Sequence, residues 1–141
     1  AVIEGSRPGK TIGLRADSDA LPLEEKTSVE WSSKVPMAMH ACGHDGHVGT
    51  LLAAVHYINQ HRDFAGRLVA IFQPGEEGFA GGRYMIEDGL VQKFGIDEFY
   101  ALHAEPMLPV GCVGFQVLQR PMQTFSKLHL RASAVTDPVL I

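Results

Sequence analysis

The sequence has 141 residues, of which 45% are hydrophobic and 20% charged, and it carries a formal net charge of −4. This length is sufficient for one domain with a hydrophobic core. The acidic balance argues against a nucleic-acid partner or a membrane surface, since either would favour a basic patch. No apolar run approaches the roughly 20 residues needed to cross a bilayer, and no signal peptide is recognisable at the start.

Two cysteines, Cys42 and Cys112, are too few for a disulfide framework. Cys42 lies in a histidine-rich stretch, and Cys112 lies in an apolar run that we interpret as core. A disulfide between them stays open as an alternative, although it would remove a thiolate from the histidine-rich stretch. We interpret both thiols as reduced, which indicates the cytoplasm.

The first predicted strand covers residues 11 to 16. Two carboxylates, Asp17 and Asp19, follow it directly, and open α/β sheets place their binding sites at this end of the strands. An Asx turn would explain the same two residues without any function. Residues 23 to 39 show no periodicity and are expected to form a long surface loop, which in a compact domain is usually functional or covers something.

Residues 40 to 47, His-Ala-Cys-Gly-His-Asp-Gly-His, carry the densest chemistry of the chain. Imidazole and thiolate are the ligands that zinc and similar ions prefer. Cys42 and His44 flank a single glycine, so both side chains can lean towards one point. A polar turn before a helix is the ordinary alternative, but the density of the cluster favours a metal or catalytic site.

After this cluster the hydrophobic residues recur with the spacing of one helix face, namely Val48, Leu51, Leu52, Val55 and Ile58. The helix is expected to begin near Asp45 or Gly46 and to end before Gly66. On its opposite face His56 and His61 are expected to be solvated. The cluster would then lie at the helix N-terminus, where the dipole favours thiolate and lowers the pKa of a cysteine.

The apolar run at residues 67 to 72 is typical of a parallel strand buried on both faces. Glu76 and Glu77 follow it, enclosed between Pro-Gly and Gly. On extended backbone successive side chains point to opposite sides, so one glutamate can bind a metal while the other faces the substrate as a general base. Two solvated glutamates in a turn are the alternative.

The remaining elements are less regular. A second helix is expected to open at Gly81-Gly82, with Tyr84, Met85 and Ile86 facing inward and Gly89 as C-cap. Further strands are expected at residues 99 to 104, 112 to 118 and 125 to 132, with His103 at the end of the first and His129 on the surface of the last. This order predicts an α/β domain with a mostly parallel central sheet flanked by helices.

The polar residues at the strand ends predict a site for two metal ions, which needs several ligands, some of them shared. The candidate ligands are Cys42, His44, one of Glu76 and Glu77, and His103. Supporting carboxylates that could orient the imidazoles are Asp17, Asp19 and Asp45.

Four motifs resemble the M20 metallopeptidase family, in its amidohydrolase branch of hippurate hydrolases, aminoacylases and auxin-conjugate hydrolases. They are Leu-Arg-Ala-Asp-Ser-Asp-Ala-Leu-Pro at 14–22, Met-His-Ala-Cys-Gly-His-Asp-Gly-His at 39–47, Phe-Gln-Pro-Gly-Glu-Glu-Gly at 72–78 and Leu-His-Ala-Glu-Pro at 102–106. The motifs occur in the family's order and spacing. The resemblance implies a zinc-peptidase-like catalytic domain.

The resemblance also implies particular roles. The implied metal ligands are Cys42, His44, Glu77 and His103, and the implied general base is Glu76. Two divalent ions (zinc, manganese, nickel or cobalt) are expected, with metal-bound hydroxide attacking the amide bond of a small N-acyl amino acid. Which acyl group and which amino acid are preferred stays open.

The sequence departs from the family in length, because a full member is much longer and carries an inserted lid. Residues 1–121 correspond to the N-terminal part of the catalytic domain, and residues 122–141 to the start of an incomplete lid or dimerisation domain. A fifth ligand, a histidine near the family's C-terminus, has no match. We interpret the chain as a fragment or incompletely represented protein, and whether residues are missing between Ala132 and Asp137 stays open. Any homodimer is expected to form through the lid.

Two other functions are compatible with the same residues. Without the lid and the fifth ligand, the chain would be a non-catalytic metal-binding module. A cysteine hydrolase would use Cys42 as nucleophile and His44 as base. We favour it least, because a cysteine and a histidine two residues apart suit ligation of one ion better than an oriented nucleophile–base pair.

Overall fold

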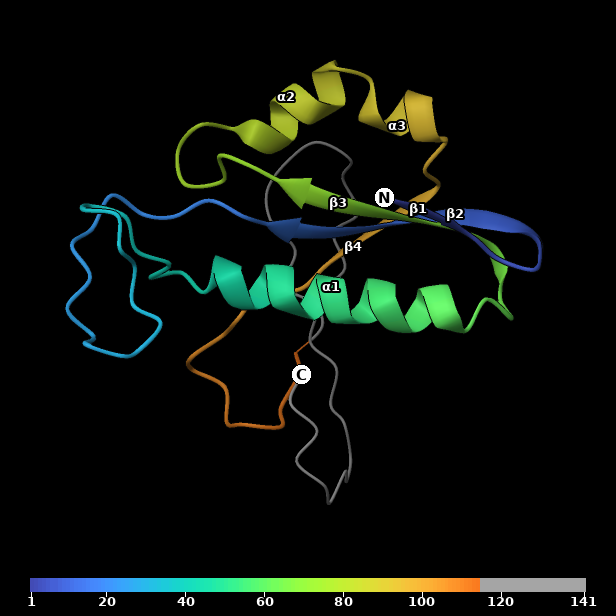
Figure 1. The fold of residues 1–141 in the computed structure, drawn as a ribbon. Coiled ribbons are helices and arrows are strands. Elements are labelled where there is room, and N and C mark those ends of the chain that lie inside the picture. The colour runs from blue at the N-terminus through green and yellow to red at the C-terminus, as the bar shows by residue number, and fades with distance from the viewer. Residues whose placement is uncertain (115–141) are drawn as a thin grey trace.

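The computed structural model describes residues 1–114, which form four strands and three helices (Figure 1). The strands are β1 (Val2–Glu4), β2 (Arg7–Asp17), β3 (Ala65–Gln73) and β4 (Glu98–Ala101), and the helices are α1 (His44–Gln60), α2 (Gly81–Glu87) and α3 (Leu90–Phe94). No helix of this part is long and apolar enough to span a membrane. The expected strand at 125–132, His129, the tail from 122 and most of the expected strand at 112–118 lie outside the described residues.

The strands form one sheet in the order β1-β3-β2-β4. β2 pairs in parallel with both β3 and β4, whereas β1 pairs antiparallel with β3. The predicted α/β domain with a mostly parallel sheet is therefore confirmed. β1 and α3 were not predicted, because three and five residues are too few to establish a periodicity.

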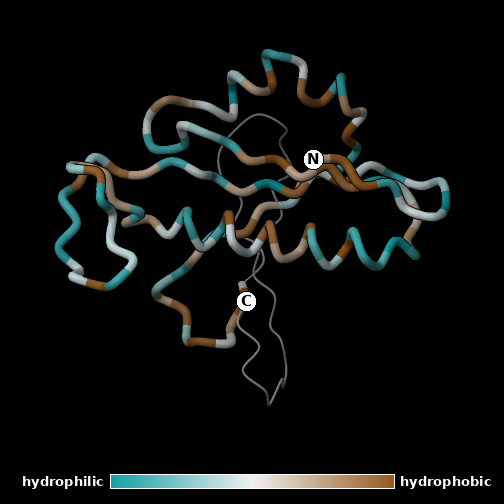
Figure 2. Tube along the Cα trace, in the orientation of Figure 1, coloured by the Kyte–Doolittle hydropathy of each residue, from teal (hydrophilic) through white to brown (hydrophobic). Residues whose placement is uncertain are grey.

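Helices cover both faces of the sheet, with α1 on one side and α2 and α3 on the other (Figure 1). Side chains of β3 alternate between these layers. Ala70 packs with Leu51 of α1, whereas Val69 and Ile71 pack in the second layer, against Met85 and the α3 region. This explains why the run at 67–72 is apolar throughout, and Figure 2 shows hydrophobic stretches in the strands between the helices.

The helix predictions need correction at single positions. On α1, Leu51 is buried and Val48 and Val55 pack beside it, but Leu52 is 52% exposed. On α2 Met85 packs inward, whereas Tyr84 and Ile86 are exposed. Successive helical residues are rotated by about 100°, so three in a row cannot all face the sheet. His56 and His61 are exposed, as expected.

The connection between β2 and α1 is the expected surface loop. An isolated antiparallel bridge between Leu21 and Met39 closes its base, and most side chains between these residues are exposed, Trp31 among them. The loop delivers the chain back to the edge of the sheet where β2 ends. The parallel strands β2, β3 and β4 all end at this edge, and α1 begins there (Figure 1).

Candidate metal centre

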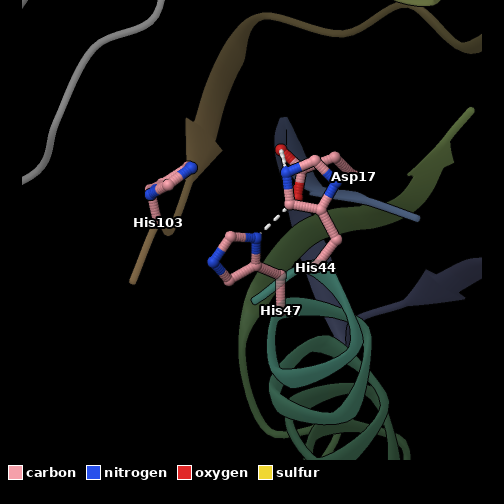
Figure 3. Close-up of side chains that lie close together, drawn as sticks. All are labelled: Asp17, His44, His47 and His103. Atoms are coloured by element: carbon pink, nitrogen blue, oxygen red, sulfur yellow. Dashed lines mark hydrogen bonds and ion pairs between the residues drawn. The ribbon is translucent and has the colours of Figure 1, made fainter. Parts of the chain in front are cut away.

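The first turn of α1 places two histidines at this edge. Gly43 precedes the helix with φ 80°, a left-handed conformation that favours glycine. His44 and His47 are three residues apart and therefore lie on one helix face, and both are buried, at 0% and 3% exposed. Figure 3 shows these rings beside Asp17 at the end of β2, with His103 across from them.

The orientation of His44 is fixed by a carboxylate. Its Nδ1–H donates to Asp19 Oδ1 at 3.2 Å. A neutral imidazole then presents its Nε2 lone pair on the other side of the ring, and carboxylate-oriented histidine is a recurrent arrangement at metal sites. His44 Nε2 is buried and has no hydrogen-bond partner among the described residues.

A second unpartnered atom faces it. Glu77 Oε1 is also buried without a hydrogen bond among residues 1–114, and it lies 3.6 Å from His44 Nε2. Cys42 Sγ lies within 4.8 Å of suitable donor atoms of both residues. Two donors about 2.1 Å from a tetrahedral ion are about 3.4 Å apart, so Cys42, His44 and Glu77 form a donor set that fits a divalent ion.

His103 also lies next to Cys42. It lies two residues beyond β4, and its Nδ1–H donates to the Ala104 carbonyl at 2.7 Å. Its Nε2 then carries the lone pair and lies 3.6 Å from Cys42 Sγ. The thiol of Cys42 is thus close both to His103 and to the pair formed by His44 and Glu77.

The environment of Cys42 differs from the sequence prediction. Burial, together with the nearby carboxylate of Glu77, raises the pKa of Cys42 to about 11. The predicted lowering by the helix dipole is therefore wrong for the metal-free chain. Cys42 precedes the helix cap Gly43, and burial together with the carboxylate of Glu77 outweighs any lowering by the dipole.

The two aspartates after β2 are held ionised. Burial alone would raise the pKa of Asp17, but the hydrogen bond from His47 and the charge of Arg15 outweigh it and lower that pKa. Burial likewise opposes ionisation of Asp19, but hydrogen bonds from the backbone of Glu77 and Glu76 outweigh it, so that the pKa of Asp19 is lowered. Asp19 contacts both His44 and the turn that carries Glu77.

An alternative donor set, Asp17, His44, His47 and His103, also has its atoms within 4.8 Å of one another. His47 is a poor member of this set, because both of its ring nitrogens are in use. Its Nδ1–H donates to Asp17 at 2.5 Å, and its Nε2 accepts the backbone N–H of Ala104 at 2.8 Å. The first set, which needs no hydrogen bond to be broken at His47, is the better fit.

The expectation that Glu76 and Glu77 lie on extended backbone is wrong, although both residues reach the site. Glu76 and Glu77 lie in a turn after β3, not on extended backbone. Their carboxylates approach the same atom, with Glu76 Oε2 at 3.9 Å and Glu77 Oε1 at 3.6 Å from His44 Nε2. The turn itself, and not the alternation of a strand, gives each carboxylate its position.

Other expected residues stay outside the cluster. Asp45 is exposed and makes no hydrogen bond to these imidazoles within residues 1–114, and His40 is exposed too. Cys112 is exposed and not a core thiol, and both cysteines are free. Arg15 and its partner Gln73 were not predicted as part of the site, although a charged residue inside an apolar strand is a signal that could have indicated them.

Comparison with known proteins places the chain in a family. Residues 13–137 match the model of Peptidase family M20/M25/M40. The chain belongs to this family, which confirms the resemblance of its four motifs.

Two relatives and one solved structure illustrate the match. N-acetyldiaminopimelate deacetylase of Lactobacillus helveticus is 49% identical over 80% of this chain and 29% of its own length. Hippurate hydrolase of Campylobacter jejuni is 49% identical over 74% of this chain and 27% of its own length. A dinuclear metal-binding M20 peptidase from Bacillus subtilis superimposes with a TM-score of 0.77 at 40% identity, covering 82% of this chain and 32% of that chain. The chain thus spans less than a third of the length of these proteins.

Proposed function

We propose that these residues belong to a metal-dependent amidohydrolase that cleaves the amide bond of N-acyl amino acids. The facing pair of unpartnered buried atoms, His44 Nε2 and Glu77 Oε1, with Cys42 beside them, carries the proposal. The names of the two relatives, a deacetylase and a hippurate hydrolase, both denote hydrolysis of N-acylated amino acids. Their substrates are the reason for proposing this class here.

The proposed centre holds two divalent ions, in keeping with the dinuclear relative. Cys42, His44 and Glu77 would hold one ion, and Cys42 with His103 would contribute to the second. Zinc, manganese, nickel and cobalt all suit a donor set of thiolate, imidazole and carboxylate. When bound, such ions polarise the amide carbonyl and lower the pKa of water.

Glu76 is the proposed general base. Its carboxylate lies 3.9 Å from His44 Nε2, next to the donor set without being one of its closest members. It takes a proton from the attacking water as the C–O bond forms, and it gives this proton to the amide nitrogen as the C–N bond breaks. The products are the free acid and the free amino acid.

Asp19 and Asp17 support this chemistry without touching the substrate. Asp19 keeps His44 in the tautomer that presents Nε2, and it also accepts the backbone N–H of Glu77.

We further propose that residues 1–121 form the N-terminal part of the catalytic domain and that residues 122–141 form the start of a lid. A homodimer through that lid and a cytoplasmic location are part of the same proposal.

The replacement Glu76→Gln tests the proposal in the full chain. We expect metal content, measured by plasma mass spectrometry, to stay at the wild-type value. The rate of hydrolysis of N-acetyl- and N-benzoyl-amino acids should fall roughly a hundredfold to ten-thousandfold. Glu87→Gln is the matched control, since Glu87 pairs with Arg83 on the surface of α2. Unchanged turnover in Glu76→Gln would overturn the assignment of the base.

A non-catalytic metal-binding module is the second candidate, because the chain spans only 29% of the deacetylase. Bound metal without hydrolysis of either substrate would favour it. The cysteine-hydrolase alternative is weaker, because the raised pKa keeps Cys42 protonated near neutral pH and a thiol is a poor nucleophile.

A further inference from the structure

A continuous network of hydrogen bonds joins the segments that carry the candidate ligands. Arg15 Nε donates to Gln73 Oε1 at 2.8 Å, and Arg15 Nη1 donates to Asp17 Oδ2 at 2.7 Å. Asp17 also accepts from His47, which in turn accepts from the backbone of Ala104. The hydrogen-bond network therefore extends from the end of β3, through β2 and α1, to Ala104, the residue next to His103.

His47 is the member of this network that contacts the segment carrying His103. Its ring centroid lies 4.7 Å from that of His103, and Figure 3 shows the two rings on neighbouring segments. Because Nδ1–H donates to an ionised carboxylate and Nε2 accepts a backbone N–H, the ring is neutral with one defined tautomer. Neither nitrogen is available to a metal while these hydrogen bonds persist.

The segment that His47 contacts needs such support. His103 lies beyond β4, which has only four residues and forms one edge of the four-stranded sheet. His44, in contrast, is part of a 17-residue helix. The hydrogen bond from Ala104 N–H to His47 ties the segment of His103 to the first turn of that helix.

We propose that His47 is a positioning residue that holds the segment of His103 in place before any ion binds. This inference rests on the proposed metal centre, in which His103 is a ligand. A ligand that is already in position loses less conformational freedom when metal binds, and residues that orient ligands typically alter metal affinity by about 10- to 100-fold. His47 acts through the backbone of Ala104, next to the ligand and not on it.

Two replacements in the full chain separate this role from general packing. His47→Gln keeps an acceptor of similar reach for the N–H of Ala104, whereas His47→Phe keeps a flat ring without an acceptor. The control is His56→Phe, because His56 is exposed on α1 and its one side-chain hydrogen bond within residues 1–114 is to Gln60. Thermal unfolding establishes that each variant is folded.

The first measurement needs no metal. Hydrogen exchange of the Ala104 amide, followed by NMR in the metal-free protein, should be slow in the wild type and in His56→Phe. It should be at least tenfold faster in His47→Phe and intermediate in His47→Gln. Wild-type exchange in His47→Phe would overturn the proposed contact.

The second measurement is cobalt(II) titration, in which absorption from thiolate-to-cobalt charge transfer reports on Cys42 and calorimetry counts the ions. In His47→Phe, the affinity for one of the two cobalt ions should fall by about tenfold or more. The affinity for the other ion should stay within threefold of the wild-type value. His47→Gln should restore most of the loss. If the affinities for both cobalt ions fall equally, and fall together with the thermal stability, His47 is only a packing residue and the proposal is overturned.

The two proposals fail in different ways. If the wild type binds no metal, the proposed function fails and the ligand role of His103 fails with it. If the wild type binds two ions normally and His47→Phe does too, only the positioning role fails. Should His47→Phe not fold, Ala104→Pro removes the same hydrogen bond from the donor side, and we expect the same selective loss.

Discussion

The two sides of the candidate centre are built differently. His44 belongs to a helix, is fully buried and has its tautomer fixed by Asp19. His103 lies on irregular backbone after a short edge strand, is only partly buried and is supported through Ala104. One side is therefore held by regular secondary structure, and the other by hydrogen bonds to a neighbouring segment. We expect the two proposed ions to differ in affinity, with the tighter one on the side of His44.

The largest effect should come from the residue that both sides share. Cys42→Ala removes the thiol between His103 and the pair of His44 and Glu77, so both ions should lose a ligand. We expect the affinity for each to fall by more than about a hundredfold, measured by competition with a chelator. Cys112→Ala is the control, since that thiol is exposed. Loss of only one ion would show that Cys42 does not serve both sides.

A smaller and one-sided effect is expected at Asp19. In Asp19→Ala, His44 loses its orienting carboxylate and the turn of Glu77 loses its backbone contact. We expect roughly 10- to 100-fold weaker binding of the tighter ion and little change at the ion near His103. Calorimetric titration resolves the two steps. Equal weakening of both would mean that the two sides are coupled more closely than their separate supports indicate.

The smallest effect concerns acid stability of the metal-free chain. The pKa of Asp17 is lowered in the folded state from its ordinary value of 3.8, so the stabilisation is complete above that value and is lost as pH falls towards the folded pKa. The midpoint temperature of thermal unfolding should therefore fall as the pH is lowered below about 4. Asp17→Asn should flatten this dependence. A control with Asp45→Asn, which alters an exposed carboxylate, should keep the wild-type slope.

The sequence predicted the elements whose signal is local. The run at 67–72 and the apolar repeat after residue 47 identify β3 and α1, because strand and helix periodicities need only their own residues. The order of the elements then brings Asp17, Glu77 and His103 to one edge, because parallel strands share their direction. Those elements were enough to place the candidate site, though not to assign each role within it.

The errors arise where distant residues decide. The pKa of Cys42 is raised by burial in the folded chain and by Glu77, which is 35 positions away. Arg15 was not predicted to take part in the site, but it donates to Asp17 and Gln73. The glutamate pair was placed on extended backbone, although Pro74-Gly75 before it is a turn signal. Such contacts become visible only when the strands are assembled.

The left-handed Gly43 has a consequence for design. Its φ of 80° turns the backbone between Cys42 and His44, so in the proposed centre these two donors, separated by one glycine, can reach the same ion. A residue with a side chain would destabilise this conformation by about 1–2 kcal/mol. If the proposed centre is correct, a Cys-Gly-His segment followed by a helix brings two donors together within three residues, and a carboxylate in the position of Asp19 then orients the histidine.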